Sequence, residues 1–234
     1  MEILTVADCH GRLGESELLE TLDGRKPDVI FFLGDNEYND IECVKANLKD
    51  VQMFGVIGNH DELDILERCR IENLNRRVIN FDGFLIGGFG GTVKYKNDSF
   101  RLLFTNQESE ELMNGFPQVD ILITHDKPCF RVEKKSDISE QEKPDKTLFQ
   151  KVKDLFLKSD TGDETSDEAE AKPTEPEYEP AHSGLTGIAE YIQRKRPSYV
   201  LHGHLHEPHI EVCYGTTIRC CFRTEFFALS KKLL

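Results

Sequence analysis

Residues 51–61, VQMFGVIGNHD, join an apolar run to the polar tetrapeptide Gly58-Asn59-His60-Asp61. A short apolar run that stops at polar residues is typical of a buried strand ending in a loop. The loop carries an amide, an imidazole and a carboxylate, which are side chains suited to metal binding and acid–base chemistry. Such a tetrapeptide would arise by chance in about one sequence in a thousand of this length. The stretch therefore predicts a strand whose carboxyl end presents functional groups.

The same arrangement recurs along the chain. Buried strands are predicted at 3–7, 29–33, 51–57, 84–89, 121–124 and 199–201, with helices at 15–22, 41–48 and 62–69. Ligand-type residues follow the strand ends and are Asp8 and His10, Asp35, Asn59, His125, and His204 with His206. Because functional groups in α/β sheets gather at the carboxyl ends of the strands, we expect these five blocks to converge.

Taken singly, each block has an ordinary explanation. A lone Asp-x-His is more often a turn with a solvated histidine, Gly34-Asp35 is a common turn, and His204 with His206 could be a structural pair. Their joint occurrence changes the balance, since five of the eight histidines lie in these blocks. The pattern therefore favours one metal site over five unrelated turns.

The order of these blocks resembles the signature of the calcineurin-like metallophosphoesterase family, which is D-x-H, G-D, G-N-H-D, a separate His and G-H-x-H. The motifs span Asp8 to His206, and the spacing looks most like the smaller, phosphodiesterase-type branch. The resemblance implies an α/β fold (α+β in some schemes) in which two packed mixed β-sheets are flanked by helices, a four-layer sandwich.

The resemblance also implies two divalent metal ions. Asp8, His10, Asp35 and His206 would hold one ion, Asp35, Asn59, His125 and His204 the other, and Asp35 would bridge them. Mixed imidazole, carboxylate and amide ligands suit Mn, which we favour, or Fe or Zn, whereas an all-oxygen shell would point to Mg or Ca. Such a pair of ions would generate a bridging hydroxide for in-line attack on phosphorus.

Other residues are assigned smaller roles. His60 is outside the metal shell and is the candidate to donate a proton or stabilise the transition state. Asp61 and Asp126 follow ligands and are candidates to orient them. Arg223 could reach a substrate phosphate, although a surface arginine is the simpler reading. Protein phosphatases of the family carry an aspartate at the position of Tyr38. The residue that would assist His60 in catalysis therefore stays open.

Length and composition indicate one domain of 234 residues with an insertion at about 131–182. Within it, 146–157 predicts an amphipathic helix, and 158–181 a mobile acidic loop that could contact a protein partner. This stretch supplies about half of the net charge of −14. A second helix is predicted to follow Ser183, which would be its N-cap. Strands are predicted on both sides of a turn at Tyr214-Gly215. The seven cysteines lack paired spacing and are expected to be free thiols.

The sequence thus predicts a dinuclear, metal-dependent phosphodiesterase or phosphatase acting on a small or nucleotide-type phosphate ester. No signal peptide or long apolar run is present, so we expect a cytoplasmic protein without membrane contact. A nuclease of the same family is the first alternative, but the acidic balance and the lack of a basic patch make nucleic acid an unfavoured partner. A non-catalytic interaction scaffold is the second; no motif residue is missing, which weighs against it.

Overall fold

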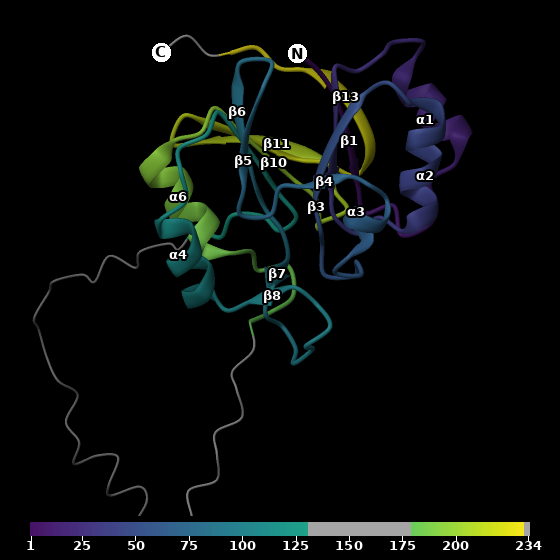
Figure 1. Ribbon diagram of the computed structural model, residues 1–234. Helices are drawn as coiled ribbons and strands as arrows, with labels where there is room; N and C mark the ends of the chain where they lie inside the picture. Colours follow the sequence, from purple (N-terminus) through teal and green to yellow (C-terminus); the bar gives the residue numbers. More distant parts are fainter. Residues whose placement is uncertain (131–178, 232–234) are drawn as a thin grey trace, which may run out of the picture. The chain divides into compact units, whose positions relative to one another are not determined.

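The computed structural model describes residues 1–130 and 179–231, which form one compact unit (Figure 1). The predicted insertion at 131–182, with its helix at 146–157 and its acidic stretch, lies outside the described residues except for 179–182. None of the helices in the described ranges has the length and apolar character needed to span a bilayer.

The first sheet contains the strands that carry three of the five motifs. Its order is β13-β1-β2-β3-β4, built from β13 (Arg223–Ala228), β1 (Glu2–Ala7), β2 (Val29–Leu33), β3 (Gln52–Val56) and β4 (Glu72–Asn73). β1 to β4 are parallel, and β13 runs antiparallel to β1. The carboxyl ends of β1, β2 and β3 therefore lie at one edge, where the loops bearing Asp8, Asp35 and Asn59 begin.

The second sheet carries the remaining motifs. Its order is β11-β12-β10-β9-β6-β5, built from β11 (His209–Cys213), β12 (Thr216–Cys220), β10 (Tyr199–His202), β9 (Ile121–Thr124), β6 (Phe84–Phe89) and β5 (Val78–Phe81). The four inner strands are parallel and the two edge strands antiparallel. A separate short pair, β7 (Thr92–Val93) and β8 (Leu103–Phe104), lies outside both sheets.

Helices cover the outer face of each sheet. Figure 1 shows α1 (Glu15–Leu22), α2 (Tyr38–Asn47) and α3 (Ile65–Arg68) on one side, and α4 (Asn106–Asn114) and α6 (Thr186–Lys195) on the other. Alternation within β2 explains the layers: Ile30 and Phe32 pack in the cluster with the first helices, whereas Phe31 and Leu33 pack between the sheets. The predicted four-layer α/β architecture is confirmed.

Several local predictions are confirmed and others need correction. α1 has its predicted bounds, the turn at Tyr214 and Gly215 joins β11 to β12, and none of the seven cysteines, all of which lie in the described ranges, forms a disulfide. α3 is a single turn, much shorter than the predicted 62–69. The prediction that Ser183 caps α6 is wrong, because the N-cap is Leu185 and the Ser183 hydroxyl makes no hydrogen bond.

Two helix starts were misplaced or missed, and both are set by side-chain caps. α2 begins at Tyr38, three residues before the prediction, because the Asp40 carboxylate accepts from the Glu37 N–H at 2.9 Å. α4 was not predicted, although Thr105 and Glu108 form a capping box that could have been found.

Candidate metal centre

The loops that follow the strands turn sharply at the predicted ligands themselves. Five of these residues have positive φ, between 48° and 71°: Asp8, His10, Asp35, His204 and His206. Asp and His tolerate this left-handed region better than most side chains, but it still costs free energy. Five of the thirteen non-glycine residues with positive φ in the described ranges are therefore predicted ligands.

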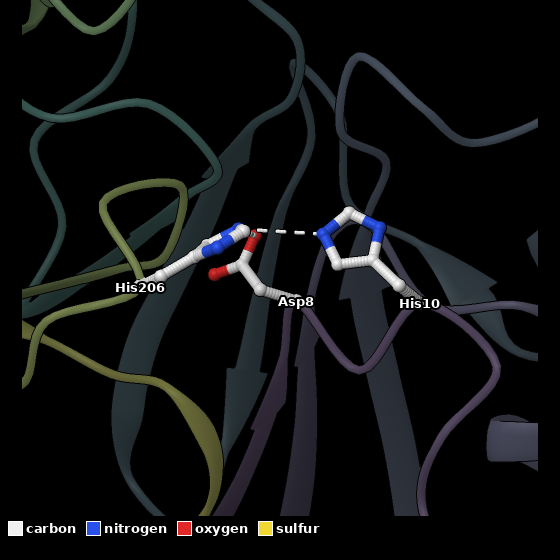
Figure 2. A group of neighbouring side chains, drawn as sticks. All are labelled: Asp8, His10 and His206. Atoms are coloured by element: carbon white, nitrogen blue, oxygen red, sulfur yellow. Dashed lines mark hydrogen bonds and ion pairs between the residues drawn. The ribbon is translucent and has the colours of Figure 1, made fainter.

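The first cluster consists of Asp8, His10 and His206 (Figure 2), and their ligand atoms all lie within 4.8 Å of one another. His10 Nε2 is 3.3 Å from His206 Nε2, and His206 Nε2 is 3.6 Å from Asp8 Oδ1. The other oxygen, Asp8 Oδ2, accepts from the His204 N–H at 2.8 Å. The backbone of one motif thus holds the carboxylate of another, although 196 residues separate them.

The second cluster consists of Asp35, His125 and His204, all buried, with ligand atoms again within 4.8 Å. His125 Nδ1 lies 2.7 Å from the Leu33 carbonyl oxygen, to which it donates, so Nε2 faces the cluster. This Nε2 is 3.5 Å from Asp35 Oδ2 and 3.1 Å from Asn59 Oδ1. Asn59 therefore lies beside this cluster.

Both clusters fit divalent cations. In the described part of the chain, Asp8 Oδ1, Asp35 Oδ2 and His204 Nε2 are buried without any hydrogen-bond partner. A buried polar atom without a hydrogen bond is costly, and cations would bind the lone pairs of all three atoms. The mixture of imidazole nitrogen and carboxylate oxygen suits first-row transition metals. The two clusters share no residue, so the bridging role of Asp35 stays a prediction.

The charges of the second cluster are coupled. Burial alone would raise the pKa of Asp35, but the nearby charge of His125 and the hydrogen bond from the His60 N–H outweigh burial and lower that pKa. Burial would lower the pKa of His125, yet Asp35 raises it to about 10. Without a metal ion, the two side chains form an ion pair that keeps a proton on His125.

In four other groups of the site, burial is the main cause of the pKa shift. It raises the pKa of Asp8 to about 7 and lowers the pKa of His204 to about 2. Burial also lowers the pKa of His60 and of His206. These three imidazoles are therefore neutral at pH 7, which is the form that offers a lone pair.

Buried carboxylates hold the loops rather than the ligand side chains. Asp61 accepts from the backbone N–H groups of Asp35 and Gly58, each at 2.8 Å, and of Asn36 at 2.9 Å. It thereby ties the loop after β2 to the loop after β3. Asp126, also predicted to orient a ligand, instead accepts from the N–H groups of Val93 and Lys127.

A further carboxylate, which the sequence did not single out, supports the first cluster. Asp40 accepts from the N–H groups of Gly11 at 2.7 Å and Leu13 at 2.9 Å. These residues lie one and three positions after His10. Asp40 therefore both begins α2 and holds the loop that carries a predicted ligand.

Two motif glycines are required by close packing. A Cβ on Gly58 would lie 2.1 Å from Asp35 Oδ1, and one on Gly34 would lie 2.4 Å from His125 Nδ1. Gly34 also has φ +95°, a conformation that side chains disfavour. The glycines in G-D and G-N-H-D thus let ligands from neighbouring loops lie against the backbone.

The clusters open onto a cavity of about 430 Å³. It is lined by Asp35, Asn59, His60, Tyr95, Lys96, Ala181, His182, His204 and His206. His182 stacks on His204, with ring centres 4.4 Å apart, and the ring of His60 lies 5.4 Å from that of His10. His60 also lines an adjoining cavity of about 290 Å³ with Arg101 and Tyr38.

Tyr95 and Lys96 were missed by the sequence analysis. They lie on the connection between β7 and β8, in no recognisable motif, and Asn59 is 36 residues from Tyr95. Arg101, whose guanidinium donates to the backbone oxygens of His60 and Asp61, was missed for the same reason. No local pattern marks any of the three.

Arg223, His202 and His209 do not line the cavity. The Arg223 guanidinium donates to both carboxylate oxygens of Glu17 and to the Arg12 carbonyl oxygen, so its role toward a substrate gains no support. His202 is buried in β10 with Nδ1 3.0 Å from the Gly203 carbonyl oxygen, and His209 is exposed on β11. Neither lines the cavity.

Comparison with known proteins identifies related sequences and folds. A family model described as calcineurin-like phosphoesterase matches residues 1–208. No match is found among curated proteins. Among solved structures, phosphopantetheinyl hydrolase (PptH) from Mycobacterium tuberculosis is 13% identical with a TM-score of 0.53, covering 94% of this chain and 89% of that one.

Two further structures are more distant. NAD nucleotidase (NadN) from Haemophilus influenzae is 12% identical with a TM-score of 0.46, covering 95% of this chain and 44% of that one. Wild-type Vps29 complexed with zinc from Entamoeba histolytica is 11% identical with a TM-score of 0.42, covering 95% and 74%. At these identities the likeness to PptH concerns the fold alone.

Proposed function

Since the chain belongs to the calcineurin-like phosphoesterase family and is a metal-dependent phosphoesterase, we propose that it hydrolyses a small or nucleotide-type phosphate ester with two divalent cations. The observation that carries the proposal is the pair of clusters, each with three ligand atoms within 4.8 Å, and the three buried atoms in them without hydrogen-bond partners. Two separate groups of ligands favour two ions over one.

The proposed ligands divide between the clusters. Asp8, His10 and His206 would hold one ion, and His125, His204 and Asn59 the other, with Asp35 reaching toward both. Mn is the ion we favour, with Fe or Zn as alternatives, because the donor set mixes imidazole with carboxylate and amide oxygen. Two such cations, when bound, lower the pKa of water and neutralise negative charge on phosphoryl oxygens.

The chain's own side chains supply the remaining chemistry. His60 lines the cavity and its backbone N–H is anchored on Asp35 Oδ1 at 2.8 Å, so its imidazole is held beside the place where the phosphoryl group would bind. In its neutral form it still donates one N–H hydrogen bond, to a phosphoryl oxygen or to the leaving oxygen. No side-chain nucleophile is required.

The test is a Mn-loaded assay on a phosphomonoester, a phosphodiester and a panel of nucleotides, with bound metal measured on the same sample. Two metal ions per chain together with turnover of at least one class would support the proposal. Stoichiometric metal without turnover of any phosphate ester would favour a non-catalytic scaffold, and one ion per chain with turnover would contradict the dinuclear site.

A further inference from the structure

One wall of the cavity contains no predicted metal ligand. It is formed by Tyr95 and Lys96 from the connection between β7 and β8, and by Ala181 and His182. Among the described residues that line the cavity, Lys96 is the one lysine or arginine. A cation on this wall is unexpected in a chain of net charge −14, and no metal-binding role explains it.

The position of the Lys96 ammonium is tied to the metal clusters through Tyr95. The Tyr95 hydroxyl accepts from Asn59 Nδ2 at 3.0 Å, and Lys96 Nζ lies 5.4 Å from the centre of the Tyr95 ring. An ammonium over a tyrosine face is attracted to the ring's negative potential. The cation is therefore held near the site by a ring that itself contacts a proposed ligand.

The ion pair with Asp98 leaves the Lys96 ammonium able to bind a further anion. Its Oδ2 lies 3.2 Å from Lys96 Nζ, while its Oδ1 accepts from the Phe100 N–H. The Lys96 side chain is 44% exposed, and an ion pair at such a site contributes little. An ammonium has three donors, so at least one stays available for a substrate anion.

Size and charge together indicate what Lys96 would bind. The charge of the transferred phosphoryl group would be neutralised by the metal ions, and His60 would donate a hydrogen bond to it, which leaves Lys96 facing another part of the substrate. A cavity of about 430 Å³ holds much more than one phosphoryl group. A lysine serves well as a point charge for phosphate.

We propose that Lys96 binds a second phosphate on the leaving group, so that the preferred substrates are phosphate esters of phosphorylated alcohols, such as nucleoside bisphosphates. This inference rests on the proposed function. Hydrolysis adds water across one P–O ester bond: the hydroxyl goes to phosphorus, the proton to the leaving oxygen, and the second phosphate stays on the leaving alcohol.

The kinetic test compares adenosine 3′,5′-bisphosphate with 5′-AMP and 3′-AMP on the Mn-loaded protein. The wild type should favour the bisphosphate in kcat/KM by about 10- to 100-fold, the range of a hydrogen bond to a charged group. Lys96→Met should remove this preference and leave both monophosphates within about twofold. Lys94→Met is the matched control, since Lys94 is on the same connection and does not line the cavity; it should keep the preference.

A loss in Lys96→Met that is equal for all three nucleotides would overturn the proposal, as would no loss. Binding of the same nucleotides to the Mn-loaded His60→Ala protein, measured by calorimetry with and without Lys96→Met, provides a readout that is independent of turnover. If the wild type hydrolyses no phosphate ester, the proposed function fails, and this binding preference still decides whether Lys96 selects a second phosphate.

Discussion

The side-chain amide of Asn59 donates from Nδ2 to the hydroxyl oxygen of Tyr95 at 3.0 Å, which leaves its Oδ1 facing His125 Nε2 at 3.1 Å. Only the amide oxygen can bind a cation, so the orientation of the amide matters. Tyr95 sets that orientation from a loop outside both sheets. It therefore acts on the second cluster through Asn59.

Tyr95→Phe should weaken metal binding at the second cluster by about 10-fold, the lower end for loss of a residue that orients a ligand. Metal titration followed by equilibrium dialysis measures this directly. Tyr38→Phe is the control. Tyr38 lines the adjoining cavity and, among the described residues, makes no hydrogen bond to a proposed ligand. Equal metal affinity in both variants would remove the role assigned to Tyr95.

Gly58→Ala should disturb the centre without any change in its ligands. The added Cβ would lie 2.1 Å from Asp35 Oδ1, so the Asp35 loop must move, at a cost of about 1–3 kcal/mol in the free energy of unfolding. Urea denaturation and metal content are the measurements. Gly115→Ala is the matched control, since a Cβ there meets nothing within 4 Å; similar effects from both substitutions would refute the packing argument.

Asp35→Asn should lose metal and hydrolysis together. The amide can still accept from the His60 N–H, so the loop is kept while the negative charge opposite His125 is removed. Metal analysis of the purified protein should then find fewer than two ions. Asp23→Asn, at an exposed αL helix cap that tolerates asparagine, controls for the chemical change. A variant with two ions and full turnover would exclude Asp35 as a bridging ligand.

His60→Ala should keep both metal ions and lower kcat by about 10²- to 10⁴-fold, the usual contribution of a positioned proton donor. The exposed His209, which does not line the cavity, provides the control substitution His209→Ala. Turnover and metal content are measured on the same samples. If the rate of His60→Ala equals that of the control, His60 has no part in the chemistry.

Metal binding should release protons and strengthen as pH rises. Asp35 raises the pKa of His125 to about 10 and burial raises that of Asp8 to about 7, so both groups hold protons below these values in the metal-free protein. A cation displaces them, about one at pH 8.5 and about two at pH 6. Calorimetry in buffers of different ionisation enthalpy counts these protons. Affinity that increases on acidification would contradict the assignment of both ligands.

Much of the framework follows from local sequence. The strands at 29–33 and 121–124 match their predictions residue for residue, because an apolar run of five residues or fewer bounded by polar ones has few other uses. The predicted ligands converge because parallel strands place their carboxyl ends at one edge. Asp40 and Ser183 show the limit: the capping role of Asp40 was not predicted, and Ser183 was predicted as the cap of a helix whose N-cap is Leu185.

What the sequence alone determined is the kind of chemistry: five strand ends carrying imidazole, carboxylate and amide groups in one order. The tertiary structure decided which groups meet. It placed Tyr95 on Asn59, His182 on His204, and Glu17 on Arg223, 206 residues away, so that an arginine considered for substrate binding is paired elsewhere. Strand and turn patterns are visible in the sequence because they arise from contacts between near neighbours in the chain. The residues that line a cavity lie on loops, and their positions in the sequence follow no periodic pattern.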